Sequence, residues 1–234
     1  MDFIADGFRR GAQLIASGDA EVFGIALLSF RVAVVATILS CLIGIPIGFV
    51  VGTTRFWGRR AAITALNTML AFPTVVVGLL VWGLLARSRP LGGTGLLYTW
   101  WAIVIAEVLL ATPIAAALTA AAVQGIDPRV RRTAMTLGAG PLRVHWAVAR
   151  EARYALGAAV VVAFGRVLAE VGAAMIVGGN IRHHTRTLTT AVALATSQGD
   201  FALAMALGLV LISIALTVNV LLQMLKARGD AAGA

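Results

Sequence analysis

Five long runs of apolar residues, separated by short polar connections, dominate the pattern of this chain. They cover roughly residues 24–52, 63–86, 96–123, 154–177 and 201–225. An α-helix needs about 20 apolar residues to cross the hydrocarbon core of a bilayer, and each run is at least that long. The pattern therefore predicts an all-α fold, a polytopic transmembrane helical bundle of about five spans.

The segments outside these runs divide the chain into three regions. Residues 1–23 mix Phe3 and Phe8 with charged side chains, which is typical of an amphipathic helix lying at the membrane surface. Residues 24–226 hold all five runs and predict one transmembrane domain, and residues 227–234 predict a C-terminal tail. A cleaved signal peptide is not expected, because the first apolar run is too long and lacks a small-residue cleavage site.

A polar, arginine-rich segment at residues 124–153 separates the third run from the fourth and predicts a hairpin of two short helices. Asp127 followed by Pro128 favours a helix start, since aspartate suits the N-cap and proline the first helical position. Gly138 and Pro141 then predict the end of the first helix and the start of the second. The hairpin either lies on anionic lipid or docks a soluble partner.

Composition and charge agree with a membrane protein. Hydrophobic residues make up 60% of the chain and charged residues 12%, about half the share of ~25% that soluble domains carry. The net charge of +9 comes from arginines in short connections, so it does not indicate nucleic-acid binding. Eleven cations and three acids lie on the side of the hairpin, against six cations and five acids opposite. The positive-inside rule therefore predicts a cytoplasmic hairpin and C-terminus, with the N-terminus outside.

Four ionisable side chains fall within apolar runs, where each is costly and suggests a function. Arg166 and Glu170 are four residues apart and predict an ion pair on one helix face. This pair either stiffens the fourth span, or presents Arg166 to a transport pathway while Glu170 limits its hold on an anion. Glu107 is expected to pair with a cation on another span, and Arg31 to reach the membrane surface.

A polar loop follows the fourth run. Gly178, Gly179 and Asn180 offer backbone N–H groups and an amide, which suit an oxyanion. Arg186 and Thr187 add a guanidinium and a hydroxyl group. The loop predicts either a transient anion site or gate, or an ordinary glycine turn before a short helix.

No catalytic, cofactor or metal site is predicted from the sequence. His183 and His184 are adjacent, point in different directions and have no nearby cysteine or acidic partner. No nucleophile and base stand at a convincing spacing. The phosphate-binding pattern G-x-x-x-x-G-K-[ST] is missing from the sequence, so any ATP hydrolysis would belong to a partner.

The hairpin resembles the cytoplasmic loop of type I ABC importer permeases. That loop carries Glu-Ala-Ala, three residues, a glycine, about nine residues, and then Ile-x-Leu-Pro. This chain has Arg132-Thr133-Ala134, three residues, Gly138, nine residues and then Val148. The spacing and both Ala134 and Gly138 match. Arginine stands in place of the usual glutamate, and Arg-Glu in place of Leu-Pro.

Other segments resemble the same family over about residues 26–225. Residues 71–78 are similar to its second span. Residues 166–175, 178–181 and 185–190 resemble the sulfate, molybdate and tungstate branch, and within it the tungstate importer permeases most of all.

The resemblance implies a permease subunit of an ATP-driven importer in the cell membrane, carrying a tetrahedral oxyanion. Tungstate is favoured, with molybdate or sulfate as alternatives. It implies a homodimer in membrane lipid, a pair of ABC ATPase subunits on the cytoplasmic side and an extracytoplasmic oxyanion-binding protein. The chain itself would be no enzyme. The residues implied in ATPase coupling are Arg132, Thr133, Ala134, Gly138, Ala139 and Gly140. The candidate pathway or gate residues are Arg166, Glu170, Gly178, Gly179, Asn180, Arg186 and Thr187.

Two alternatives belong to other classes of protein. An integral-membrane enzyme would use Glu107 or Glu170, and it would need a paired acid or a cluster of metal ligands near one membrane face. An ATP-independent carrier would leave the hairpin without a purpose, and the inverted repeats that are common in carriers are not apparent. Co-purification with an ATPase separates the importer from both.

Overall fold

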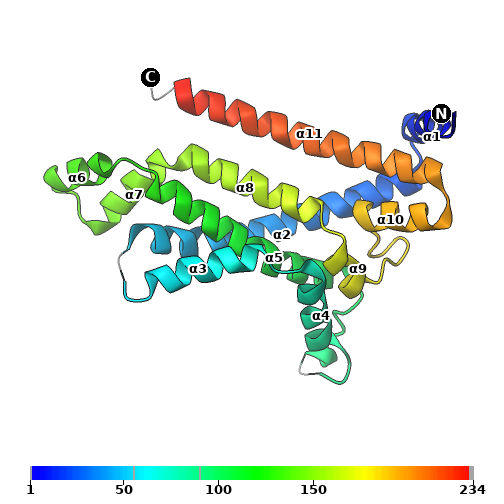
Figure 1. Ribbon diagram of the computed structural model, residues 1–234, viewed down its shortest axis with the longest axis horizontal. Coiled ribbons are helices and arrows are strands. Elements are labelled where there is room, and N and C mark those ends of the chain that lie inside the picture. Colours follow the sequence, from blue (N-terminus) through cyan, green and yellow to red (C-terminus); the bar gives the residue numbers. More distant parts are fainter. Residues whose placement is uncertain (1, 55, 90, 232–234) are drawn as a thin grey trace.

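The computed structural model describes residues 2–54, 56–89 and 91–231 of the 234-residue chain, all of them in helices or connecting loops. Helices α2, α5, α8 and α11 run along the long axis of an elongated bundle (Figure 1). This arrangement confirms the predicted all-α bundle. The helices are α1 (Asp2–Ala16), α2 (Ala20–Thr53), α3 (Arg59–Leu70), α4 (Thr74–Leu85), the short 3-10 helix η1 (Gly92–Thr94), α5 (Trp100–Gln124), α6 (Pro128–Thr136), α7 (Pro141–Glu151), α8 (Arg153–Leu168), α9 (Gly172–Gly178), α10 (Leu188–Gln198) and α11 (Phe201–Ala231).

Three helices are long and apolar enough to cross a membrane: α2, α5 and the Phe201–Leu221 part of α11. Two bent pairs, α3 with α4 and α8 with α9, pass the same test when each pair is counted together. The described residues thus hold three to five candidate spans, in agreement with the expected number. Helix α11 continues into the predicted tail as far as Ala231, and residues 232–234 lie outside the described part.

The apolar run at 63–86 does not form one continuous helix. Helices α3 and α4 are separated by residues 71–73, and their axes meet at 96°. Pro73 explains the break, because it has no N–H to donate and its ring disfavours helical geometry in Phe72 before it. Figure 1 shows α4 leaving the bundle nearly at a right angle, whereas α3 packs along α5.

The run at 154–177 is broken as well, with a bend of 59° between α8 and α9 at residues 169–171. The prediction that Arg166 and Glu170 share one helix face is therefore wrong, because Glu170 lies in the break. Its carboxylate accepts the backbone N–H of Ala173 at 3.1 Å. This bond supplies a partner to the first turn of α9, where N–H groups lack partners within the helix.

The tightest packing in the bundle joins α2 to α5. Gly44, Gly48 and Gly52 recur every four residues on the face of α2 that meets α5. A Cβ atom added at Gly48 would overlap the carbonyl oxygen of Ala116, and one at Gly44 would lie 2.7 Å from a backbone oxygen of α5. Small residues on both helices let the backbones approach closely.

The N-terminal segment forms helix α1, which packs against the first turns of α11. Gly7 and Gly11 are buried at the contact, where a Cβ at Gly7 would overlap the ring of Phe201. Phe8 is about half exposed on another face of α1. The predicted amphipathic segment is therefore a helix that is fixed to the bundle by its glycines.

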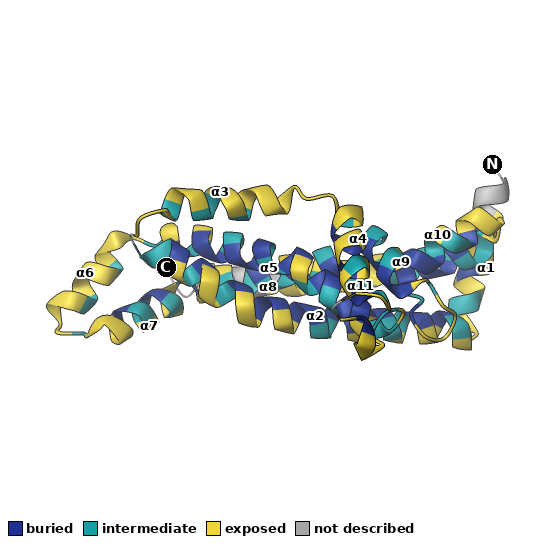
Figure 2. Cartoon of the chain, turned by 90° about the horizontal axis from the view of Figure 1, so that it is seen from below, coloured by how far each residue is buried: buried dark blue, intermediate teal, exposed yellow. Residues whose placement is uncertain are grey.

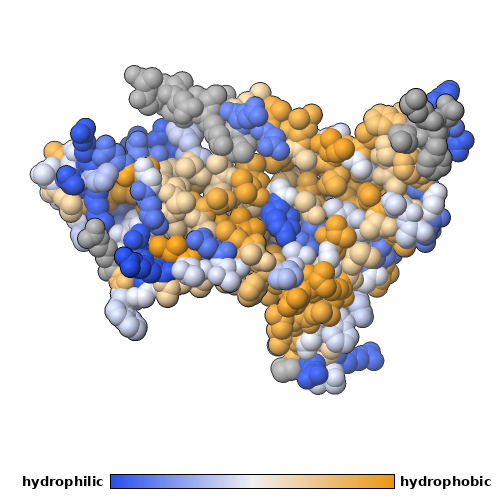
Figure 3. Space-filling view, in the orientation of Figure 1, coloured by the Kyte–Doolittle hydropathy of each residue, from blue (hydrophilic) through white to orange (hydrophobic). Residues whose placement is uncertain are grey.

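The surface separates an apolar body from polar ends. Apolar side chains cover much of the middle of the molecule, and hydrophilic ones gather over α6 and α7 (Figure 3). Figure 2 shows that α3 and α6 are mostly exposed, whereas the buried residues follow the inner faces of α2, α5 and α9. This distribution is the one expected of a bundle that spans a membrane, with α6 and α7 outside the lipid.

Candidate functional site

The hairpin of α6 and α7 has the ends that its sequence predicts. The Asp127 carboxylate accepts the N–H of Arg129 at 2.8 Å and caps α6, and Pro128 is the first helical residue. After α6 the chain turns through Gly138, whose φ of +77° is left-handed and suits glycine. Helix α7 then begins at Pro141.

The tip of this hairpin exposes apolar side chains. Leu137, Leu142 and Trp146 are 80%, 83% and 63% exposed. Exposed apolar groups among cations are typical of a surface that contacts a protein or a membrane. The predicted coupling residues gather here: Arg132, Thr133, Gly138 and Gly140 are exposed, and Ala134 and Ala139 are half-buried.

Helix α7 anchors the hairpin to the bundle. Val148 is buried in a small core with Val123 and Ala152, and the ring of Phe49 meets His145 edge to face at 5.9 Å. His145 is thus half-buried. Helix α6, by contrast, has no buried residue and packs chiefly against α7.

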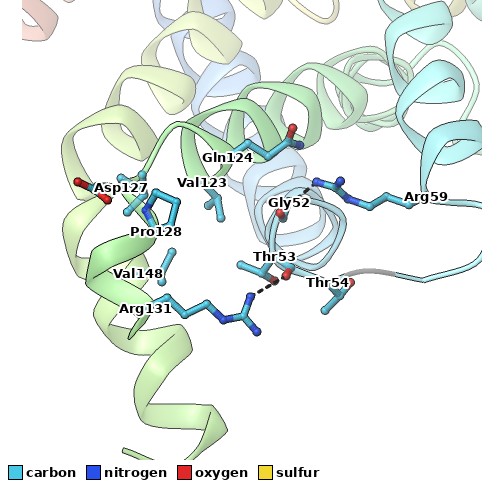
Figure 4. Close-up of a pocket in the computed structure, with 11 residues that line it drawn as sticks. Gly52, Thr53, Thr54, Arg59, Val123, Gln124, Asp127, Pro128, Arg131 and Val148 are labelled. Carbon is cyan, nitrogen blue, oxygen red and sulfur yellow. Dashed lines mark hydrogen bonds between the residues drawn. The ribbon is translucent and has the colours of Figure 1, made fainter. Parts of the chain in front are cut away.

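A pocket of about 290 Å³ opens where α2 and α5 end and α6 begins (Figure 4). Arg59 donates from Nε to the carbonyl oxygen of Val51 at 2.8 Å and from Nη2 to that of Gly52 at 3.3 Å. Arg131 donates from Nη1 to the carbonyl oxygen of Thr53 at 3.2 Å. Carbonyl groups at a helix C-terminus lack intrahelical partners and attract cations. Two arginines therefore hold the last turn of α2.

Arg166 and Glu170 form the predicted ion pair, with Nη1 and Oε2 2.7 Å apart. The Glu170 side chain is 3% exposed and that of Arg166 is 36% exposed. Thr189 also donates to the backbone oxygen of Glu170 at 2.6 Å, which ties α10 to the break between α8 and α9. The carboxylate is thus fully enclosed, while part of the guanidinium reaches the surface of the chain.

Of the other two ionisable groups, Glu107 differs from its prediction and Arg31 has an aromatic partner. Glu107 is 2% exposed, and no salt bridge reaches it within the described residues. Its expected cation is missing from this part of the chain because Arg166 is taken by Glu170 and Arg31 by an aromatic ring. The Arg31 guanidinium lies 4.4 Å from the ring centroid of Trp100, the first residue of α5, and makes a cation–π contact, although the residue itself is exposed.

The glycine turn after α9 keeps its donors within the chain. Thr185 donates from Oγ1 to the carbonyl oxygen of Gly178 at 2.6 Å. The N–H of Gly179 donates to α9 at 3.0 Å, and the Asn180 amide donates to a carbonyl oxygen of α10 at 3.2 Å. These bonds are those of the glycine-turn alternative, and they occupy the Gly179 N–H and the Asn180 side-chain amide.

Arg186 and Thr187 are neighbours in the sequence but have different partners. Arg186 is 3.5 Å from the Glu21 carboxylate, which Arg182 also holds at 3.0 and 2.5 Å. Thr187 caps α10 in a reciprocal pair with Thr190, and it lines a small cavity that Glu170 also lines. Sequence reasoning missed Glu21 as a partner, because it is 165 positions from Arg186.

These features define a polytopic helical membrane protein with a structured helical hairpin at one polar end. The family model of binding-protein-dependent transport system inner membrane components matches residues 44–230, and the chain belongs to this family. It is therefore the multi-pass inner membrane permease of an ABC importer. ATP hydrolysis belongs to a separate ATPase subunit, and a substrate-binding protein is a further partner.

The relatives agree with the resemblance to oxyanion permeases. The chain is 40% identical over 194 residues to the tungstate uptake system permease protein TupB of Peptoclostridium acidaminophilum, covering 83% of this chain and 85% of the relative. It is 30% identical over 174 residues to the molybdenum transport system permease protein ModB of Escherichia coli (strain K12), and the match covers 71% of this chain and 76% of the relative. The solved structure of an amino acid ABC transporter shares the fold, with a TM-score of 0.70 and 17% sequence identity. The match covers 92% of this chain and 96% of the transporter chain.

Proposed function

We propose that this permease forms the membrane pathway for a tetrahedral oxyanion, and that tungstate is its substrate. The observation that carries the proposal is the 40% identity to a tungstate uptake permease over 83% of this chain. Molybdate has the same tetrahedral shape and charge, and the relative at 30% identity makes it the second candidate. Sulfate, of like shape and charge, is the third.

In this proposal the hairpin and the C-terminus face the cytoplasm and the N-terminus lies outside. The hairpin and the far end of α11 lie at one end of the bundle, and α1 lies at the other (Figure 1). The excess of arginine in the connections at the hairpin end supports a cytoplasmic position.

Two copies of the chain line one pathway. The surface of α8 supports this arrangement, because it exposes short side chains beside the guanidinium of Arg166. A guanidinium that faces lipid within a span is costly, whereas short side chains favour helix contacts. An aqueous pathway against this face hydrates the guanidinium, and a second copy of the chain packs on the short side chains. The exposed short side chains are Ala155, Val162, Gly165 and Ala169.

Arg166 attracts the oxyanion in the pathway, and its bond to Glu170 prevents a tight hold that would stall transport. The loop with Gly178, Gly179 and Asn180 serves as an outer gate together with Arg186 and Thr187. Because this loop is bonded to α2 and α10, the gate moves with those helices rather than binding the anion by free donors.

A cleft of the ATPase receives the hairpin tip through Arg132, Thr133, Ala134, Gly138, Ala139 and Gly140. Its exposed apolar side chains and cations support docking to a protein over resting on lipid alone. When the ATPase pair closes on ATP, the two hairpins move together and the bundle changes from inward-facing to outward-facing. This is alternating access by rigid-body motion.

Gly138→Val is expected to uncouple transport. A β-branched residue is strained at a φ of +77°, by about 1–2 kcal/mol. Strain of this size lowers the population of the native turn between α6 and α7 by a factor of about 5–30, and oxyanion uptake is expected to fall in proportion. Uptake into cells and recovery of the ATPase with the tagged permease in mild detergent are the two measurements.

Gly199→Val is the matched control. Gly199 also has a φ of +77° after a helix, and a Cβ there meets no atom within 4 Å, as at Gly138. Its turn joins α10 to α11 at the opposite end of the bundle (Figure 1). Uptake should fall only in the Gly138→Val variant. If that variant imports at the wild-type rate, the hairpin has no part in the mechanism, and a permease recovered without any ATPase would favour a carrier or a membrane enzyme.

A further inference from the structure

We propose that Arg131 transmits motion from the hairpin to the transmembrane helices, as a positioning residue that links α6 to the end of α2. The inference rests on the proposed function of the hairpin as the docking element for the ATPase. It assigns a role to one arginine that is defined by its contact and separate from the docking surface itself.

The link is a single bond from an otherwise loosely attached helix. Helix α6 buries none of its side chains. Among the described residues, the bond from Arg131 Nη1 to the Thr53 carbonyl oxygen is the one side-chain hydrogen bond from α6 to a transmembrane helix. Figure 4 shows Arg131 reaching from α6 across the pocket to the last turn of α2. Movement of α6 against the bundle therefore acts on α2 through this bond.

Helix α2 is suited to carry that movement to the other end of the molecule. It is continuous over 34 residues and is locked against α5 by its glycines. Near its outer end the hydroxyl of Ser29 accepts the N–H of Leu188, the first residue of α10, at 2.6 Å. Glu21, in the first turn of α2, holds Arg182 and Arg186 of the proposed gate loop. One stiff helix thus joins the hairpin to that loop.

A purely structural role would be to cap the C-terminus of α2. Arg59 already fills that role, because it gives two bonds to the same turn, at 2.8 and 3.3 Å, from α3 outside the hairpin. If capping were what matters, Arg59→Ala would be the more damaging change. If transmission matters, only the arginine on α6 affects coupling. The two residues therefore separate the two roles.

The experiment measures ATP hydrolysed per tungstate imported, using proteoliposomes that contain the permease, its ATPase and its binding protein. Arg131→Ala should raise this ratio about three- to tenfold, which lies within the range that the net contribution of one typical hydrogen bond corresponds to. ATPase recovery with the permease should stay unchanged. Arg131→Lys should restore part of the coupling, since an ammonium group can still donate one bond.

Arg59→Ala and Arg129→Ala are the controls and should keep the wild-type ratio. Arg129 lies on the same helix with an 88% exposed side chain, and its charged contact is to the nearby Asp127. The inference is overturned if Arg59→Ala uncouples as strongly as Arg131→Ala, which would make both residues helix caps. It is also overturned if Arg131→Ala loses the ATPase or leaves the ratio unchanged.

The proposed function fails separately from this inference. If the wild-type complex imports no oxyanion with ATP, the function itself is wrong. If the wild type imports tungstate and Gly138→Val uncouples it, while Arg131→Ala stays fully coupled, only the assignment of Arg131 is wrong.

Discussion

Arg166→Gln is expected to lower the free energy of unfolding by about 3 kcal/mol, because it leaves a buried carboxylate without its cation. The Glu170 side chain is only 3% exposed, and its bond to Arg166 is 2.7 Å long. The expected loss lies at the low end of the range for a broken buried pair, since solvent reaches about a third of the arginine. Thermal unfolding of the purified permease in mild detergent measures it.

The double variant, with Gln at both positions, should regain most of that stability, because two neutral side chains leave no buried charge unpaired. Its oxyanion uptake should nevertheless stay low, since the positive charge in the proposed pathway is gone. A double-mutant cycle over Arg166 and Glu170 separates the two effects. An Arg166→Gln variant as stable as the wild type would contradict the claim that Glu170 is enclosed and needs Arg166 as its partner. If the stable double variant imports at the wild-type rate, the pair is structural and does not serve the pathway.

Gly48→Val is expected to force α2 and α5 apart, with a loss of about 3 kcal/mol, the upper end for overpacking a close contact. A Cβ at Gly48 would overlap the carbonyl oxygen of Ala116, and a backbone atom cannot move aside as a side chain can. The yield of folded permease in the membrane and its thermal unfolding are the measurements.

Gly24→Val is the matched control on the same helix. A Cβ at Gly24 meets no atom within 4 Å, so the same substitution makes no such overlap there, and helix propensity slightly favours valine over glycine. The comparison separates the contact between helices from the general effect of valine in α2. A Gly48→Val protein as stable as the control would contradict the packing of α2 on α5.

The long elements could be predicted from the sequence because their signals are local. Apolar runs of sufficient length gave the helical bundle, and the pattern around Asp127 and Gly138 gave the hairpin with its cap and its left-handed turn. The pairing of Arg166 with Glu170 was predicted for the wrong reason: the side chains meet across a break, rather than along one helix. Charge and proximity in sequence were enough to bring them together.

The remaining parts depend on partners that are distant in the sequence. Pro73 favours a break in the helix, but the turn of 96° follows from how α3 and α4 each pack. Glu21 holds arginines more than 160 positions away. Arg131 reaches a carbonyl oxygen of Thr53, and a backbone acceptor leaves no mark in the sequence. Hydrophobic periodicity therefore predicted which elements form, while these long-range polar contacts could be found only in the structure.

Uptake of tungstate into proteoliposomes that contain the permease and its ATPase, with the binding protein on the outer side, tests the proposed function most directly. Tungstate is expected to accumulate only when ATP, the ATPase and the binding protein are all present, and more efficiently than molybdate or sulfate. Accumulation of tungstate without ATP or without the ATPase would contradict the proposal, as would the failure of all three anions to enter.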